Sequence, residues 1–126
     1  MDVNDPATRT AVWQQFERYE AALVGNDVPV LDALFWNSPH TIRYGAGENL
    51  YGHAEISGFR AARSPVGLSR RLERTVITSF GPDMATACTL FRRDSAPGKV
   101  GRQSQVWVRL EEGWRVVAAH VSVIPG

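Results

Sequence analysis

The second half of the chain limits the fold most, because almost all of it favours β-strands. Long segments rich in β-branched and aromatic residues are separated only by short turns that contain glycine or proline. These segments span residues 70–80, 84–93, 101–110 and 114–124. Turns this short join neighbouring antiparallel strands, so the sequence predicts a meander of four long strands.

The first half shows the periodicity of helices. Apolar residues recur at spacings of three and four, and Asp5 and Asp27, which favour helix starts, precede two of the segments. The pattern predicts helices over residues 8–24, 28–35 and 53–62, and a short strand over residues 40–44. Helices followed by a meander indicate an α+β fold, with three helices packed on one face of a curved antiparallel sheet.

Length and composition limit the class of protein. A chain of 126 residues fits one domain with one core, so we expect residues 1–126 to form a single domain. With 44% hydrophobic and 21% charged residues, it resembles neither a disordered chain nor a coiled coil. The formal charge of +1 and the lack of a long apolar run give no reason to expect nucleic acid or a membrane as partner. The single cysteine, Cys88, cannot form an intrachain disulfide, and we expect a cytoplasmic protein.

Arginine dominates the basic residues: the chain has thirteen arginines and one lysine, Lys99. Because a guanidinium group can hold a planar carboxylate through two parallel hydrogen bonds, this bias favours a small anionic ligand. A GC-rich genome, which favours arginine codons over lysine codons, would explain the same bias without a ligand.

No established catalytic or metal-binding motif is present. The histidines His40, His53 and His120 lie far apart without the spacing of metal ligands, and no phosphate-binding glycine loop occurs. We therefore expect neither a metal nor a cofactor.

Two residues of the first half are candidates for chemistry. Tyr19 lies on the inward side of the predicted first helix, and Arg43 is the only charged residue of the short strand. A buried arginine requires an anion, which a protein carboxylate such as Glu48 or a ligand would supply. Tyr19 taken alone is better explained as an aromatic core residue.

The last hairpin suggests a polar surface on the sheet. Pairing Leu110 with Arg115 across the final turn fixes a register for the last two strands. The polar residues that this register places on one face are Gln103, Gln105, His120 and Ser122, and continuing it through the earlier hairpins adds Arg71. Such a set is either a satisfied hydrogen-bond network or a pocket lining, and we interpret it as a substrate-binding surface.

Several stretches are distinctive beyond their periodicity. They are FERYEAAL (16–23), LFW (34–36), RYG (43–45), GFR (58–60), GRQSQVW (101–107) and GWRVVAAHVS (113–122). Over about residues 8–123 they resemble the AtzH/HpxZ-type family of SnoaL-like proteins, within the nuclear transport factor 2-like superfamily. The last two stretches are the most specific.

The resemblance implies a cone-shaped fold in which three helices close over a strongly bent sheet and leave a pocket, usually in a homodimer formed through the sheet. It also implies a small, planar, carboxylated urea as substrate. One member type of the family is associated with the conversion of 1,3-dicarboxyurea to allophanate during cyanuric acid breakdown. The other is associated with oxalurate and ureide catabolism. The proposed catalytic tyrosine and arginine of the family fall on Tyr19 and Arg43.

Elementary chemistry suits this role. A carboxylated urea nitrogen loses carbon dioxide most easily when a cation polarises the urea carbonyl, and Arg43 would supply that cation. Tyr19 would exchange the proton at nitrogen, and Arg71 would pair with the other carboxylate. The scheme needs no metal or cofactor.

Two other kinds of function stay open. The domain could bind a small carboxylate without converting it, or assist a partner amidase, as some domains of this fold serve only in assembly. A ring isomerase is less well supported, because it needs an isolated carboxylate base and only Glu48 and Glu73 are available.

Overall fold

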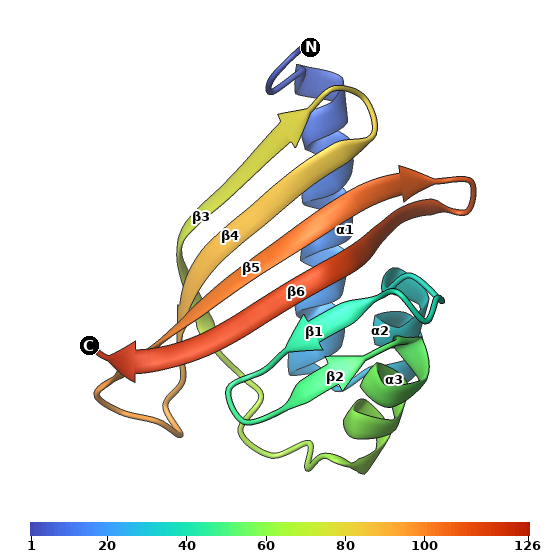
Figure 1. Ribbon diagram of the computed structural model, residues 1–126. Helices are drawn as coiled ribbons and strands as arrows, with labels where there is room; N and C mark the ends of the chain where they lie inside the picture. The colour runs from blue at the N-terminus through green and yellow to red at the C-terminus, as the bar shows by residue number, and fades with distance from the viewer.

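The computed structural model describes residues 1–126 and shows three helices and six strands (Figure 1). The helices are α1 (Pro6–Val24), α2 (Val28–Leu34) and α3 (His53–Ala62). The strands are β1 (Ile42–Tyr44), β2 (Asn49–Tyr51), β3 (Arg71–Phe80), β4 (Met84–Arg92), β5 (Lys99–Leu110) and β6 (Gly113–Pro125). All three predicted helices and the four long predicted strands are present, with ends that differ by one or two residues, so the α+β prediction is confirmed.

Local signals explain where the first two helices begin. The carboxylate of Asp5 accepts a hydrogen bond from the backbone N–H of Thr8 at 3.1 Å, and that of Asp27 accepts one from Val30 at 3.3 Å. Each helix also has a proline in its first turn, where the missing N–H costs nothing. Both starts are therefore determined by residues close in sequence.

The sheet has the strand order β2-β1-β6-β5-β4-β3. The predicted meander β3 to β6 is antiparallel, but β1 pairs with β6 in parallel, so the sheet is mixed and not antiparallel throughout. The short strand β2 was not predicted, because three residues with no apolar alternation carry no strand signal. It pairs with β1 and extends the sheet beside α3 (Figure 1).

The register predicted for the last hairpin is wrong. Leu110 pairs with Gly113 across a two-residue turn, not with Arg115. Between Trp107 and Leu110, each residue of β5 therefore pairs with a residue of β6 two positions earlier than predicted, and up to Val116 the residues of β6 still face the predicted side of the sheet. A β-bulge after the Trp107–Val116 pair then adds one residue to β6. Beyond the bulge, every residue of β6 faces the side opposite to the predicted one.

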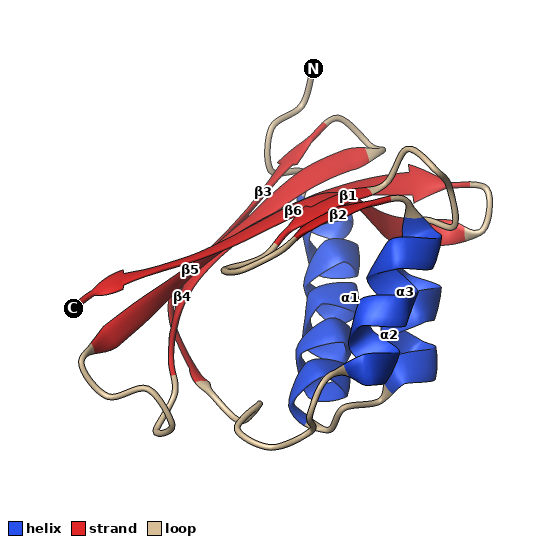
Figure 2. Ribbon diagram, turned by 60° about the horizontal axis from the view of Figure 1, so that its bottom comes forward, coloured by secondary structure: helices blue, strands red, loops and turns tan.

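The three helices cover one face of the bent sheet, which we call the inner face (Figure 2). Sixteen buried hydrophobic residues form one core between the helices and this face, with Trp107 fully buried. The opposite, outer face has no helix over it, and most of its strand residues are half-buried or exposed. None of the helices is long and apolar enough to cross a membrane.

Candidate active site

A cavity of about 250 Å³ lies at one end of the space between the helices and the inner face. Its walls come from α1, α3, β1, β4, β5 and β6, and from the segments that follow β1 and α3. Tyr19 and Arg43 both line it. The tertiary structure therefore brings together the two residues that the family resemblance singled out.

Tyr19 projects from the inward side of α1 and is 3% exposed. Its ring lies 6.2 Å from the ring of Phe35, within the core, and its hydroxyl group makes no hydrogen bond to the protein. A buried phenol normally finds a partner, so a free hydroxyl at a cavity wall is available to a ligand.

Arg43 points from β1 into the cavity and forms a partly buried ion pair with Glu48. Its Nη1 donates to Glu48 Oε1 at 2.8 Å, and its guanidinium lies 5.4 Å from the centre of the Phe59 ring. A Cβ at position 45 would overlap the Glu48 carboxylate, so a larger residue in the intervening turn would require the Glu48 side chain to move. The protein carboxylate expected for a buried arginine is therefore present, and it is Glu48.

Arg70 is the second cavity cation that a carboxylate neutralises. Its Nε donates to Glu20 Oε2 at 2.9 Å and its Nη2 to Glu20 Oε1 at 2.6 Å, a bidentate pair between α1 and the segment before β3. Nη2 also donates to Gln103 Oε1 at 3.0 Å, and the guanidinium lies 4.5 Å from the centre of the Phe91 ring. These contacts hold the Arg70 side chain, which is 1% exposed, in one position.

Two further arginines line the cavity without a carboxylate partner. Arg63, just after α3, has Nε and Nη2 buried with no hydrogen-bond partner. Arg93 lies with its guanidinium 4.7 Å from the centre of the same Phe91 ring, and no protein acceptor binds it. Burial lowers the pKa of Arg63, with Arg43 adding to the effect, and burial together with Arg70 lowers the pKa of Arg93.

The cavity is therefore strongly cationic. Four arginines line it, and Glu48 and Glu20 neutralise two of them, which leaves a formal charge of +2. In a partly desolvated site these charges attract anions far more strongly than they would in water. The arrangement suits a small ligand with two negative charges.

Arg60 lies deeper, outside the cavity lining, and is 1% exposed. Its guanidinium stacks 4.1 Å from the centre of the Phe35 ring, while Nη1 donates to the carbonyl of Leu31 at 3.3 Å. Its Nε and Nη2 have no partner, and burial lowers its pKa to about 10. It places a cation beneath the site, close enough to interact with Tyr19 and Arg43.

The polar residues predicted on the sheet do not all reach the cavity. Gln103 lines it, with a buried Nε2 that has no protein partner. Gln105 is on the inner face as predicted, but its Oε1 accepts from Trp107 Nε1 at 3.1 Å within the core. Of the polar residues predicted on the sheet, Gln103 is thus the one best placed to contact a ligand.

His120, Ser122 and Arg71 lie elsewhere, and the expectation that they share the pocket face is wrong. The bulge in β6 turns His120 and Ser122 to the outer face, where His120 packs edge-on against Tyr44 and Ser122 Oγ accepts from Arg102 Nε at 3.1 Å. Arg71 is exposed and pairs with Asp94 at 2.7 Å.

Sequence reasoning missed Arg63, Arg70 and Arg93 as a group. A faint signal existed, because Arg60 and Arg63 are three residues apart and so share one side of the end of α3. The convergence of Arg70 and Arg93 on Phe91 depends on strand pairing and has no local signature.

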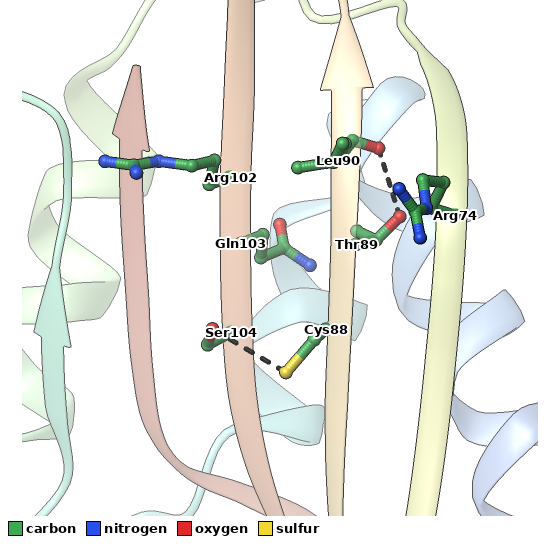
Figure 3. Close-up of a pocket in the computed structure, with 7 residues that line it drawn as sticks. All are labelled: Arg74, Cys88, Thr89, Leu90, Arg102, Gln103 and Ser104. Carbon is green, nitrogen blue, oxygen red and sulfur yellow. Dashed lines mark hydrogen bonds between the residues drawn. The ribbon is translucent and has the colours of Figure 1, made fainter. Parts of the chain in front are cut away.

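A second hollow, of about 340 Å³, lies over β3, β4 and β5 (Figure 3). Cys88 and Ser104 sit opposite each other there on β4 and β5, with Cys88 Sγ 3.7 Å from Ser104 Oγ. Cys88 is exposed. The arginines of this hollow, Arg74 and Arg102, are exposed, so it has none of the buried charge of the first cavity.

No group of three or more histidine, cysteine, aspartate or glutamate side chains is placed to hold a metal ion. The polar groups that face the first cavity are instead guanidinium groups, one phenol, one carboxylate and one amide. This set can bind anions and transfer a proton.

Comparison with known proteins identifies one matching family and solved structures that closely resemble this chain. The profile of a family described as AtzH-like matches residues 1–126. A protein of unknown function from the DUF3225 family of Pectobacterium atrosepticum is 57% identical over 98% of this chain and 95% of its own, with a TM-score of 0.95. A cystatin-like fold protein from Burkholderia xenovorans is 47% identical over 100% of this chain and 98% of its own, with a TM-score of 0.96.

A more distant structure shows the fold alone. It is a nuclear transport factor 2-like superfamily protein from Salmonella enterica, 24% identical over 92% of this chain and 90% of its own, with a TM-score of 0.74. No curated protein matches the chain.

Proposed function

The chain belongs to the AtzH-like family and has the nuclear transport factor 2-like fold, and on this basis we propose that it is a decarboxylating amidohydrolase without a cofactor. Its substrate is a small carboxylated urea, with the conversion of 1,3-dicarboxyurea to allophanate as the leading candidate. The observation that carries the proposal is that Tyr19 and Arg43 meet in one cavity whose formal charge is +2. A dicarboxylated urea has two negative charges and matches that charge.

The reaction replaces one carboxyl group on nitrogen by a proton. The bond between nitrogen and the carboxyl carbon breaks, carbon dioxide leaves, and the electron pair stays on nitrogen and spreads into the urea carbonyl. Arg43 stabilises the negative charge that develops on the carbonyl oxygen. Tyr19 donates the proton to nitrogen through its hydroxyl group and regains one from water.

The roles of the two residues follow from their surroundings. Glu48 contacts only one of the two terminal nitrogens of Arg43, so the remaining N–H groups are free for the substrate. The Tyr19 hydroxyl has no protein partner that a substrate would need to displace. Arg71, His120 and Ser122 have no part in the proposed chemistry, since their side chains lie outside the cavity.

Turnover of freshly prepared 1,3-dicarboxyurea tests the proposal, with allophanate measured by mass spectrometry. A reaction without protein corrects for spontaneous loss of carbon dioxide. We expect acceleration by the wild-type protein that disappears in Arg43→Ala. The absence of acceleration in a folded wild-type protein would favour instead a carboxylate-binding domain that assists a partner amidase.

We also propose a homodimer formed through the outer face. Since Gln105 and Trp107 are buried on the inner face, strand alternation places Val106 and Val108 on the outer one, where no helix covers them. Sedimentation equilibrium would show twice the mass of the 13.9 kDa chain, and Val106→Glu should shift the protein to monomer. A monomeric wild-type protein would refute this part.

A further inference from the structure

We propose that Arg63 and Arg93 form a second anion subsite, which holds the carboxylate that remains on the product while the other carboxylate is lost. This inference rests on the proposed function and assigns the two ends of the substrate within the cavity. It also predicts that the site selects dicarboxylates over monocarboxylates.

The division of the four cavity arginines into two classes is the first observation. Arg43 and Arg70 each have a carboxylate within 2.8 Å or less, Glu48 and Glu20 respectively. Arg63 and Arg93 donate no side-chain hydrogen bond within the protein, although both line the cavity. Charged groups that are partly removed from water normally have a partner, so these two are placed for an anion from outside.

Of the two arginines, Arg63 has buried nitrogens that lack a hydrogen-bond acceptor. Two of its nitrogens are buried from solvent and unpaired, which costs free energy in the empty protein. A bound carboxylate would accept hydrogen bonds from them and offset that cost. Such bonds between a guanidinium and a carboxylate are short and strong, because both partners are charged.

Arg93 reaches the cavity from the end of β4 and is positioned by Phe91. The Phe91 ring lies beneath the guanidinium groups of both Arg70 and Arg93, at 4.5 and 4.7 Å from its centre. Glu20 fixes Arg70, while Arg93 keeps its N–H groups for a ligand. Arg63 lines the same cavity, and we place the remaining carboxylate of the substrate between these two cations.

Gln103 adds a neutral donor to the subsite. Its Oε1 is used by Arg70, and its buried Nε2 has no protein acceptor. It lines the same cavity as Arg63 and Arg93. A ligand oxygen there would satisfy the amide as well as the guanidinium groups.

Physical chemistry assigns the subsite to the carboxylate that stays. The departing carboxylate loses its negative charge as carbon dioxide forms, so a cation bound to it would stabilise the ground state more than the transition state and slow the reaction. The remaining carboxylate keeps its charge throughout. Strong binding there positions the substrate without opposing the chemical step.

Equilibrium binding of two stable probes tests the inference. Glutarate carries two carboxylates at a similar separation to those of a dicarboxylated urea, and glutaramate has the same chain with one carboxylate replaced by a neutral amide. We expect the wild-type protein to bind glutarate about tenfold or more tightly than glutaramate. In Arg63→Gln and in Arg93→Gln, glutarate binding should weaken about tenfold or more, and glutaramate binding should weaken as well, because its single carboxylate occupies the same subsite.

Arg18→Gln is the matched control, because Arg18 is exposed on α1, makes no ion pair and undergoes the same change of charge. It should bind both probes as the wild type does. Thermal melting identifies any variant that fails to fold, and two separate variants keep the test independent of one such failure.

Equal wild-type affinity for the two probes, no binding of glutarate, or unchanged glutarate binding in Arg63→Gln and Arg93→Gln would overturn the subsite. The turnover assay with 1,3-dicarboxyurea is separate. A protein that selects glutarate but shows no turnover would refute the proposed function and leave the anion subsite standing.

Discussion

Gly101 on β5 lies directly opposite Phe91 on β4, and a methyl group at position 101 would overlap the Phe91 ring. The ring is 4% exposed and lies beneath Arg70 and Arg93 at the cavity wall. Because Gly101 has no side chain, the Phe91 ring can occupy the space beside it and support the guanidinium groups of Arg70 and Arg93.

Replacing Gly101 is expected to disturb the candidate site indirectly, by moving the Phe91 ring. In Gly101→Ala the ring of Phe91 must move, so we expect a loss of about 1–3 kcal/mol in the free energy of unfolding and weaker binding of glutarate. Urea denaturation and titration calorimetry measure the two effects. Gly58→Ala in α3 is the control, since its methyl group enters open space and should leave binding unchanged. Unaltered binding in Gly101→Ala would argue against a role for Phe91 in placing the arginines.

Removing the Tyr19 hydroxyl should affect the chemical step and little else. For Tyr19→Phe we expect kcat for 1,3-dicarboxyurea to fall by about 10²–10⁴, the usual contribution of a positioned proton donor, with KM nearly unchanged. Since the hydroxyl makes no hydrogen bond in the protein, the melting temperature should stay the same. Tyr44→Phe on the outer face, where Tyr44 packs against His120, serves as the control with full activity expected. A large rise in KM with normal kcat would assign Tyr19 to binding instead.

The bidentate pair between Glu20 and Arg70 should contribute strongly to stability. Glu20→Gln leaves the buried Arg70 cation without its carboxylate, and we expect the free energy of unfolding to fall by about 2–3 kcal/mol. Glu17→Gln, an exposed position on the same helix with no ion pair, should change it by less than about 0.5 kcal/mol. Equal effects from the two substitutions would show that the pair gives no net stabilisation.

The buried charge of Arg60 should lower the free energy of unfolding. Because burial lowers its pKa to about 10 in the folded protein, the unfolded state binds the proton more tightly, and the cost of the buried charge is fully present below about pH 10. We expect Arg60→Met, which keeps the length of the side chain, to raise the free energy of unfolding by about 1–3 kcal/mol. The gain should be constant from about pH 6 to 9 and shrink above about pH 10.

Chemical denaturation across this range of pH measures the gain, with Arg18→Met as a control that should show none. Lower activity of Arg60→Met toward 1,3-dicarboxyurea would indicate that the buried cation is kept for the electrostatics of the site and not for stability. A destabilised variant would contradict the prediction and show that the contacts of Arg60 with Phe35 and Leu31 outweigh the burial of its charge.

The local sequence determined most of the secondary structure. Capping by Asp5 and Asp27 acts over three residues, and the alternation in the last four strands is long enough to be read directly. The inward position of Tyr19 follows from the spacing of apolar residues on α1. These features were predictable because the interactions that produce them connect residues close together in the chain.

The tertiary structure decided which polar side chains meet. One extra residue in β6 after Val116 turns His120 and Ser122 away from the cavity, and neighbouring residues that all favour strands give no signal of a bulge. The pairing of Arg70 with Glu20 joins residues fifty positions apart, and the presence of Arg63 and Arg93 in one cavity depends on how the sheet packs against the segment after α3. Side-chain direction in a strand alternates with every residue, so the members of the site are fixed only when the register and the packing of distant elements are fixed.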